Sequence, residues 1–303
     1  MSAPRCPLCG SLAVTRMGRV ADGDFFAGRV IESPLSGGRL WRCIRCGSKF
    51  RWPTLSTSEL QALYSEGRAE QWAGSGHRID FQRLHARLAR KNGLRSVLDI
   101  GCGTGDFLAA LPAHVERFGV EPSREAAIRS ESRGIQVLGA DIFTLDAEKQ
   151  FDAISVIDVL EHLADPLEFL DAAWSHVRAD GLLLISTGDP ACLPWQMMGA
   201  RFWYVSFPEH LVFPSHRFFE RWATGRHARC EHSRFPYYRR RIPSVLAGLV
   251  AQLAYAISPW AFDRVGRAMA TVLRAPQPRR RHYSPGIPGV FVDHQLVVLC
   301  KDS

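Results

Sequence analysis

Lysine is the charged residue that this sequence has least of: four of the 38 basic side chains are lysines, and the others are arginines. Acidic residues are too few to balance them, since 30 aspartates and glutamates leave a formal net charge of +8. This positive charge permits anionic partners such as nucleic acid, a nucleotide-diphosphate ligand or an acidic membrane face. A preference for arginine without functional meaning explains it equally well, because the charge is spread along the chain outside 239–241 and 279–281.

An apolar leader segment is also lacking, because the first ten residues, MSAPRCPLCG, contain no hydrophobic run of the kind found in signal peptides. We therefore expect a cytoplasmic protein in which thiols stay reduced. The eight cysteines are therefore expected to be metal ligands or free thiols in preference to disulfides. With 303 residues, 46% of them hydrophobic and 22% charged, the chain can form one α/β domain and a smaller module, and general disorder is excluded.

The N-terminal region contains two matched pairs of cysteines, each with two residues between the thiols and a glycine after them. One turn of this kind directs two thiolates at one ion, and two facing turns make a tetrahedral four-sulfur site that suits Zn²⁺. The pattern resembles a zinc ribbon, which we expect over residues 1–52 with a structural metal, since four thiolates leave no position for a catalytic water. Iron in a rubredoxin-like site is the competing interpretation. The expected ligands are Cys6, Cys9, Cys43 and Cys46.

A helical linker is expected over residues 53–92. The segment from Ser56 to Tyr64 reads as a short helix with Ser58 as its cap, and 78–91 has apolar residues near helical spacing. Asn92 and Gly93 end this second helix and precede the main domain.

The main domain opens with a strand, a glycine-rich turn and a helix. An apolar run over 96–100 is followed at once by Gly101-Cys-Gly-Thr-Gly105 and then by a helical segment over 106–111. Glycines allow the sharp turn and a close approach of a ligand, and the helix N-terminus offers amide donors. Dehydrogenases that bind dinucleotides share such a loop, but they have a third glycine where this chain has Asp106.

Acidic residues follow the expected strands in a set order. Asp99 lies inside the first strand, Glu121 ends the second over 118–121, and Asp141 lies near the end of the third over 137–142. Carboxyl ends of parallel strands are where open α/β sheets bind ligands. A carboxylate at Glu121 can accept both hydroxyls of a ribose, and one at Asp141 can accept the amine of adenine while Ile142 packs on the ring.

Three of these segments, VLDIGCGTGDF, GVEPS and GADIF, resemble those of class I S-adenosylmethionine-dependent methyltransferases. The segment FDAISVIDVLEHLADP over 151–166 resembles the small-molecule branch, which includes ubiquinone-biosynthesis O-methyltransferases. The segment from Trp203 to His216 resembles a subgroup common among polysaccharide and sugar enzymes. A zinc ribbon before this domain also resembles the zinc-containing deoxysugar C-methyltransferases, which are longer chains.

The resemblance implies a Rossmann-like, doubly wound α/β fold with a seven-stranded sheet over 93–303. The later strands are expected at 181–186, 229–238 and 293–300, and the last one runs antiparallel. The resemblance also implies S-adenosylmethionine as cofactor, with Asp99 facing its methionine part. The implied cofactor-binding residues are Asp99, Gly101, Cys102, Gly103, Gly105, Glu121, Asp141, Ile142 and Asp158.

Methyl transfer to a hydroxyl or an acidic carbon requires a base, and histidine has a suitable pKa. His210 is the first candidate, because it follows the fifth strand in the connection that covers the acceptor pocket in this family; a loop-stabilising role is the alternative. Tyr204 and His216 are weaker candidates. Asp158, Glu161 and His162 match the spacing of a divalent-metal motif in some relatives, although a pocket-lining role is favoured.

Residues 242–262 form a long stretch without charge, within an expected helical insertion over 242–285. A lid over the acceptor site is the first interpretation, and an interfacial helix that gives peripheral contact with the inner membrane face is the second. The leading function is methylation of a small molecule such as a sugar, sugar nucleotide or lipid-linked glycan. A zinc-ribbon RNA methyltransferase and a non-catalytic cofactor-binding scaffold are the alternatives, and nucleic acid is the less favoured partner.

Overall fold

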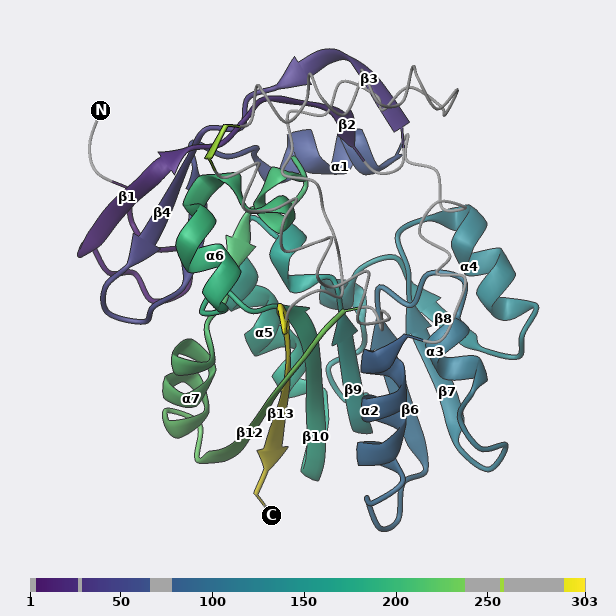
Figure 1. Ribbon diagram of the computed structural model, residues 1–303. Coiled ribbons are helices and arrows are strands. Elements are labelled where there is room, and N and C mark those ends of the chain that lie inside the picture. The colour runs from purple at the N-terminus through teal and green to yellow at the C-terminus, as the bar shows by residue number, and fades with distance from the viewer. Residues whose placement is uncertain (1–3, 27–28, 66–77, 238–256, 259–291, 303) are drawn as a thin grey trace, which may run out of the picture.

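The computed structural model describes residues 4–26, 29–65, 78–237, 257–258 and 292–302. A seven-stranded sheet forms the body of the molecule, and the N-terminal ribbon lies across one end of it (Figure 1). The expected α/β fold with a seven-stranded sheet and a preceding four-cysteine module is therefore confirmed.

The large sheet has the strand order β12-β13-β10-β9-β6-β7-β8. Neighbours from β10 to β8 are parallel, whereas β13 runs antiparallel to both β10 and β12, as predicted for the last strand. The strands are β6 (Ser96–Ile100), β7 (Glu116–Val120), β8 (Gln136–Gly139), β9 (Phe151–Ile157), β10 (Val177–Gly188), β12 (Ala228–Phe235) and β13 (His294–Lys301).

The third strand ends earlier than the sequence predicts. β8 stops at Gly139, and Asp141 caps a short 3-10 helix, η2 (Ile142–Thr144), by accepting a hydrogen bond from the backbone N–H of Phe143 at 3.2 Å. A side chain that satisfies the backbone in this way competes with the strand ladder, which explains the difference. The fifth strand is longer than the predicted 181–186, because β10 begins at Val177.

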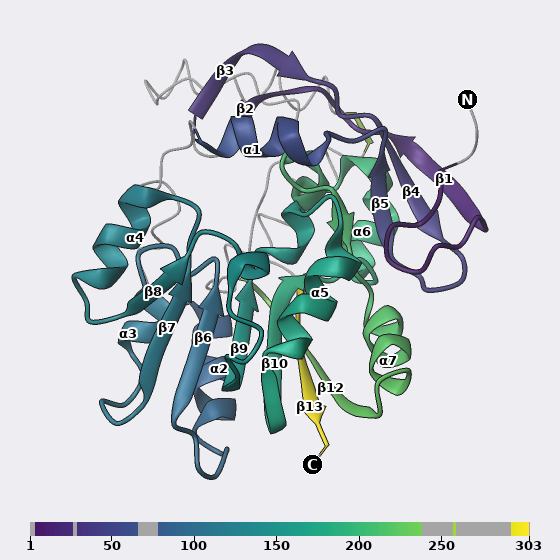
Figure 2. The ribbon, with the colours of Figure 1, turned by 180° about the vertical axis from the view of Figure 1, so that it is seen from behind.

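Helices cover both faces of the sheet, so the sheet is doubly wound (Figures 1 and 2). Alternate residues of β6 show the two faces: Leu98 and Ile100 belong to one buried cluster, and Val97 to the other. The first cluster includes α5 (Pro166–Ser175) and α7 (His216–Thr224), and the second includes α2 (Ile79–Leu88) and α3 (Asp106–Ala109). The remaining helices are α4 (Arg124–Glu131) and α6 (Leu193–Met198), with η3 (Leu160–His162), η4 (Gly199–Arg201) and η5 (Trp203–Ser206) as 3-10 turns.

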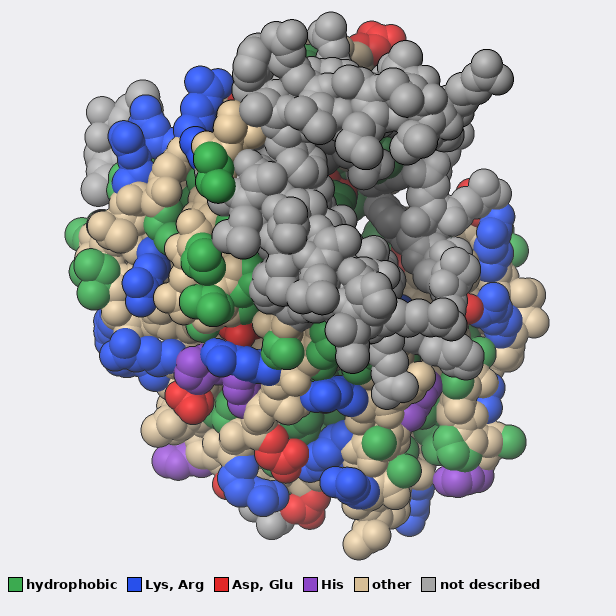
Figure 3. Space-filling model, in the orientation of Figure 1, with side chains coloured by type: hydrophobic (Ala, Val, Ile, Leu, Met, Phe, Trp, Pro, Cys, Tyr) green, Lys and Arg blue, Asp and Glu red, His purple; other side chains and the backbone are tan. Residues whose placement is uncertain are grey.

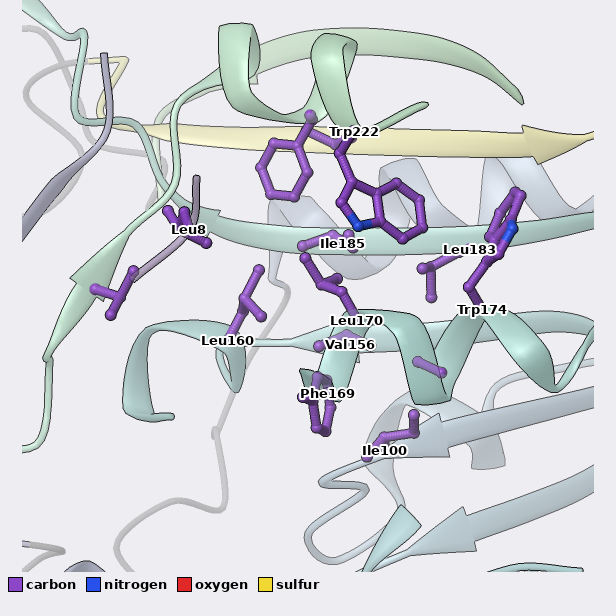
Figure 4. Packing of buried hydrophobic residues seen from close by; sticks show 14 of the residues in the cluster. Leu8, Ile100, Val156, Leu160, Phe169, Leu170, Trp174, Leu183, Ile185 and Trp222 are labelled. Atoms are coloured by element: carbon purple, nitrogen blue, oxygen red, sulfur yellow. The ribbon is translucent and has the colours of Figure 1, made fainter. Parts of the chain in front are cut away.

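The first cluster is the larger of the two and joins elements distant in sequence. In Figure 4, Ile185 of β10 lies beside Leu170 of α5 and Trp222 of α7. Burial of one such side chain stabilises the fold by about 1.5–3 kcal/mol. Leu8 of the ribbon belongs to the same cluster, so the two parts of the chain share one core.

The ribbon is built from a four-stranded sheet and a hairpin. The sheet has the order β1-β4-β5-β11, and its fourth strand comes from far along the chain, beyond β10. A two-stranded hairpin of β2 and β3 packs beside it. The bounds are β1 (Val14–Arg19), β2 (Gly23–Phe26), β3 (Arg29–Leu35), β4 (Arg39–Cys43), β5 (Lys49–Trp52) and β11 (Val212–Phe213).

Helix α1 (Thr57–Ser65) follows the ribbon, and its predicted cap at Ser58 is wrong. The Oγ atom of Ser56 accepts the backbone N–H of Glu59 at 3.3 Å, and the Glu59 carboxylate accepts the backbone N–H of Ser56 at 2.7 Å. This reciprocal pair is a capping box, which satisfies two backbone donors at the start of the helix.

Except for 257–258, the uncharged stretch 242–262 and the expected insertion over 242–285 lie outside the described residues. Within the described part of the chain, no helix has the length and apolar character needed to cross a membrane.

Candidate active site

The glycine loop after β6 makes a sharp turn. Gly101 and Gly105 have φ angles of +76° and +80°, and a Cβ atom at Gly105 would lie 2.2 Å from Ile135 Cδ1. These positions therefore require glycine for both conformation and space. Gly103 also has a positive φ of +54°, but a Cβ there would meet nothing within 4 Å, so the loop is open on that side.

Cys102 does not have the environment of a reactive thiol. Its Sγ lies against Gly119 of β7, where an added Cβ would come within 2.5 Å. Burial raises the pKa of Cys102 to about 12, so the thiol stays protonated. Its part in the loop is that of a small, buried residue.

Glu121 and the glycine loop are directly connected. One carboxylate oxygen of Glu121 accepts the N–H of Gly103 at 2.8 Å, and the other accepts the N–H of Ser123 at 2.8 Å. The side chain is buried, and burial raises its pKa. Both oxygens keep lone pairs for further donors, so the carboxylate suits a pair of ribose hydroxyls.

Asp99 lies beneath the loop and is almost fully buried, with an exposed fraction of 3%. Its Oδ1 accepts the hydroxyl of Ser155 on β9 at 2.7 Å. Burial raises the pKa of Asp99 to about 7. Asp141 is exposed, whereas Ile142 beside it is buried at the foot of η2.

Asp158 has a backbone and a side chain that are both unusual. It follows β9 with a φ of +52°, and its Oδ2 accepts hydrogen bonds from Arg78 and from the Tyr237 hydroxyl. Its Oδ1 is buried without a hydrogen-bond partner among the described residues. Burial alone would raise the pKa of Asp158, but Arg78 and His294 outweigh it and hold the pKa low. A buried carboxylate oxygen without a donor fits the ammonium group of a bound amino-acid moiety.

Arg78 is a site residue that the sequence did not reveal. It precedes α2, and its guanidinium pairs with Asp80 of that helix as well as with Asp158. It also lies over the ring of Tyr237 at 5.2 Å. Its main partner is 80 residues away, and no local pattern marks such a pair.

A second polar cluster contains Glu161, His162, His210 and Tyr204. Ligand atoms of the first three lie within 4.8 Å of one another. Glu161 is fully buried; its carboxylate accepts the hydroxyl of Tyr204 and, at 3.0 Å, that of Thr187. The rings of His162 and His210 meet edge to face at 4.7 Å between centroids.

Each histidine of this cluster has a fixed hydrogen bond. His210 Nδ1 lies 2.7 Å from the backbone oxygen of Tyr204, which can only accept, so Nδ1 carries the proton and Nε2 is the basic nitrogen. His162 Nδ1 lies 2.8 Å from the hydroxyl of Tyr64 on α1. These bonds orient both rings.

Burial raises the pKa of the carboxyl group in this cluster and lowers the pKa values of its two imidazoles. Burial raises the pKa of Glu161 to about 7, with the nearby charge of Asp158 adding to the effect. Burial lowers the pKa of His162 to about 4 and that of His210 well below its usual value. Both imidazoles are therefore neutral at pH 7, as a general base or a metal ligand must be.

His216 lies apart from this cluster in its contacts. It begins α7, and its ring stacks on His232 of β12 at 5.0 Å. Of the three predicted catalytic side chains, Tyr204 and His210 are thus brought together, with 4.3 Å between ring centroids, and His216 makes its ring contact elsewhere.

The four cysteines of the ribbon converge as predicted. The Sγ atoms of Cys6 and Cys46 are 3.8 Å apart, and those of Cys9 and Cys43 are 3.5 Å apart. A tetrahedral zinc with Zn–S bonds of about 2.3 Å separates its sulfurs by about 3.8 Å, so the four residues fit the ion. The hydrogen bond with Cys46, burial and the charge of Cys46 raise the pKa of Cys6.

The ribbon also carries a basic face. Figure 3 shows Lys and Arg side chains gathered over β1 and β4, and several arginines of these strands are exposed. Arg19 is paired with Asp22 at 3.1 Å. The exposed arginines of the ribbon are Arg5, Arg16, Arg19, Arg39, Arg42 and Arg45.

Comparison with known proteins agrees with the geometry. The sequence model of a methyltransferase-domain family matches residues 65–232. The chain is 29% identical over 146 residues to the ubiquinone biosynthesis O-methyltransferase of Aeromonas salmonicida, covering 44% of this chain and 61% of that protein. It is 31% identical over 132 residues to the enzyme of the same name from Salmonella paratyphi A, covering 40% and 54%. The chain thus spans less than two thirds of these relatives.

The chain is also similar to the solved structure of a SAM-dependent methyltransferase from Archaeoglobus fulgidus, with 18% identity and a TM-score of 0.46 over 81% of this chain and 100% of that one. Coclaurine N-methyltransferase bound to N-methylheliamine and SAH has 16% identity and a TM-score of 0.46 over 74% of this chain and 70% of that one.

Proposed function

Because this chain belongs to the methyltransferase-domain family, which its residues 65–232 match, we propose that it is an S-adenosylmethionine-dependent methyltransferase acting on a small molecule. The observation that carries the proposal is the direct bond between Glu121 and Gly103 of the glycine loop. This bond joins a buried acceptor for ribose to the turn that lets a ligand approach the backbone.

The cofactor would be held from both ends. Glu121 accepts the ribose hydroxyls, Asp141 accepts the adenine amine above Ile142, and the unpartnered Oδ1 of Asp158 accepts the amino group of the methionine moiety. Asp99 stays beneath the loop, where its bond to Ser155 fixes the end of β6. When bound, S-adenosylmethionine would supply an electrophilic methyl group: the acceptor would attack the methyl carbon in line with the S–CH3 bond, and S-adenosylhomocysteine would leave.

His210 is the proposed base. Nδ1 is held by the Tyr204 carbonyl, so Nε2 takes the proton from the acceptor. Glu161 lies within the same cluster and stabilises the imidazolium that forms, as a buried carboxylate does for a catalytic histidine. The depressed pKa of His210 keeps it ready to accept a proton at neutral pH.

A divalent metal is a second use for this cluster, favoured by the convergence of Glu161, His162 and His210. Carboxylate oxygen and imidazole nitrogen together suit Mn²⁺, Fe²⁺ or Zn²⁺. The hydroxyls of Tyr204 and Thr187 already bond both oxygens of Glu161, which favours the base over the metal.

The proposed acceptors are sugars, sugar nucleotides, lipid-linked glycans or related metabolites. The support is the segment from Trp203 to His216, with its sugar-enzyme resemblance, and the likeness to O-methyltransferases named for ubiquinone biosynthesis. RNA is the second candidate acceptor, because the ribbon has an exposed arginine face. Binding to RNA through such a face would weaken steeply with salt.

The test is transfer of the labelled methyl group from S-adenosylmethionine to a panel of sugar nucleotides, glycolipids, quinol precursors and structured RNA. His210→Gln should lower kcat by about 10²–10⁴-fold at pH 7, the usual contribution of a general base, and leave cofactor affinity unchanged. His216→Gln is the matched control and should retain the activity. Unchanged turnover in His210→Gln would refute its role as the base.

A further inference from the structure

The segment that carries His210 is held by the N-terminal ribbon more than by the sheet it follows. This segment, residues 207–215, lies between η5 and α7 and includes the short strand β11. Its contacts reach back more than 150 residues in sequence, to β5 and to the second cysteine pair. These long-range contacts, rather than the length of the segment, fix where it lies.

Arg51 is the central contact. Its Nη1 donates to the backbone oxygens of Phe207 at 2.9 Å, Pro208 at 3.0 Å and His210 at 3.4 Å. Its Nε donates to the oxygen of Gly37 in the ribbon at 3.1 Å. The side chain is buried, with 4% exposed, so water does not compete for these carbonyls.

Two further contacts fix the rest of the segment. Val212 and Phe213 pair with Phe50 and Lys49 of β5, which makes β11 the fourth strand of the ribbon sheet. Ser215 donates its hydroxyl to the backbone oxygen of Cys46, which is one of the four convergent cysteines.

The backbone N–H of Ser215 also donates to the Ser48 hydroxyl at 3.0 Å. The turn that would hold the metal is therefore one hydrogen bond away from the end of the segment. Leu211 connects the segment to the polar cluster, because its backbone N–H donates to the backbone oxygen of Glu161 at 2.7 Å.

We infer that Arg51 is a positioning residue for His210, and that the metal-bound ribbon is part of the active-site scaffold rather than a separate binding module. This inference rests on the proposed role of His210. Loss of the metal loosens the turn at Cys46, releases Ser215, and moves the catalytic segment. Activity would then depend on the metal of the ribbon because the metal keeps His210 in place, although the metal contacts no reactant.

Arginine suits this place through Nη1 and Nε, whereas its Nη2 is buried without a hydrogen-bond partner among the described residues. A planar guanidinium offers five donors in a fixed fork, and four carbonyl contacts use two of its nitrogens at once. A lysine ammonium has three donors around one point and reaches fewer of these oxygens. Burial lowers the pKa of Arg51 to about 10, so it remains protonated at pH 7.

The test is hydrogen exchange of the full chain, followed by mass spectrometry of peptides, for wild type, Arg51→Gln and Arg51→Lys. Loss of the contacts should speed exchange at residues 209–213 by about tenfold or more, with Arg51→Lys intermediate. Peptides of β6 and β9 should be unchanged. Arg117→Gln is the matched control, because Arg117 also donates to a loop carbonyl, that of Leu111 at 2.7 Å, but far from the segment in sequence.

Nuclear magnetic resonance of labelled histidines gives a second readout, because wild-type His210 should show a proton fixed on Nδ1 and Arg51→Gln should lose this preference. Removal of the ribbon metal from wild type by a chelator should speed exchange at 209–213 as well. Since this arm needs no variant, it stands even if Arg51→Gln does not fold.

Unchanged exchange at 209–213, or an equal increase in all peptides, would overturn the inference. Faster exchange confined to the ribbon after chelation would overturn the part that involves the metal. None of these readouts requires S-adenosylmethionine or an acceptor. The inference therefore fails separately from the proposed function, which fails if the cofactor does not bind.

Discussion

Two buried carboxylates, Glu161 and Asp99, are the most informative single residues of this protein. Glu161 and Asp99 are both fully enclosed, and burial raises the pKa of each to about 7. The hydroxyls of Tyr204 and Thr187 donate to Glu161 and hold it in place. The hydroxyl of Ser155 does the same for Asp99. Such groups cost stability when ionised, so they point to a function that needs them.

Glu161 should make stability depend on pH. A carboxyl whose pKa is higher in the folded protein than in the unfolded chain stabilises the fold at low pH, and this contribution is lost as the pH rises through the folded value. With a shift from 4.5 to about 7, the contribution falls across that window. Between pH 5 and pH 8, the free energy of unfolding of wild type should fall by about 2–3 kcal/mol relative to that of Glu161→Gln.

Urea unfolding of both proteins at the two pH values measures this difference. Glu131→Gln, an exposed substitution on α4, is the control and should follow wild type. Because His162 titrates in the opposite sense, only the difference between wild type and variant isolates Glu161. Parallel pH profiles for wild type and Glu161→Gln would contradict the assignment.

Residue types tied to local backbone geometry could be predicted from the sequence. The glycine loop directly follows β6, and the acids Asp99, Glu121 and Asp141 lie within strands or one or two residues after them, so their places near one edge of the sheet follow from the topology. Arg51 and Arg78 could not be predicted, because their partners lie 156–159 and 80 residues away. A long-range guanidinium contact leaves no periodic or spacing signal in the chain.

Among the structural elements, the large sheet was predictable and the ribbon sheet was only partly so. The central strands β6 and β9 are buried along almost their whole length and read as apolar runs, as parallel strands do. β11 has two residues, which is too short for any pattern, yet it joins the ribbon to the segment 207–215. Ser58 was predicted as a cap although the Ser56–Glu59 spacing of a capping box was present in the sequence.

The four-cysteine site of the ribbon should contain one zinc ion for each chain. Elemental analysis of the purified protein should find zinc near one equivalent, and Cys46→Ser should bind less and melt about 5–10 °C lower. The effect should reach the main core, because Leu8 and Phe50 of the ribbon belong to it. The matched control is Cys230→Ser, on β12, with unchanged zinc.

An iron stoichiometry near one, with visible absorption, would instead identify a rubredoxin-like centre. Full-length protein with neither metal would contradict the metal site.

At the scale of the whole molecule, the two predicted parts form one structure. The ribbon shares its sheet with β11 and its core with α7, so its removal would expose both. The domain boundaries at 52 and 92 stay predictions from the sequence, as does the role of 242–285. The global architecture that matters for function is a sheet edge with two polar clusters, one at the glycine loop and one at Glu161 and His210.

The central claim is that the glycine loop and Glu121 bind S-adenosylmethionine. Isothermal titration of folded, metal-loaded protein with S-adenosylmethionine and with S-adenosylhomocysteine tests it most directly. Wild type should bind both saturably, and Glu121→Ala should bind at least about tenfold more weakly, because two ribose hydroxyls lose their acceptor. Glu116→Ala, an exposed substitution on β7, the strand that Glu121 follows, should bind like wild type. Absence of binding to wild type would contradict the account.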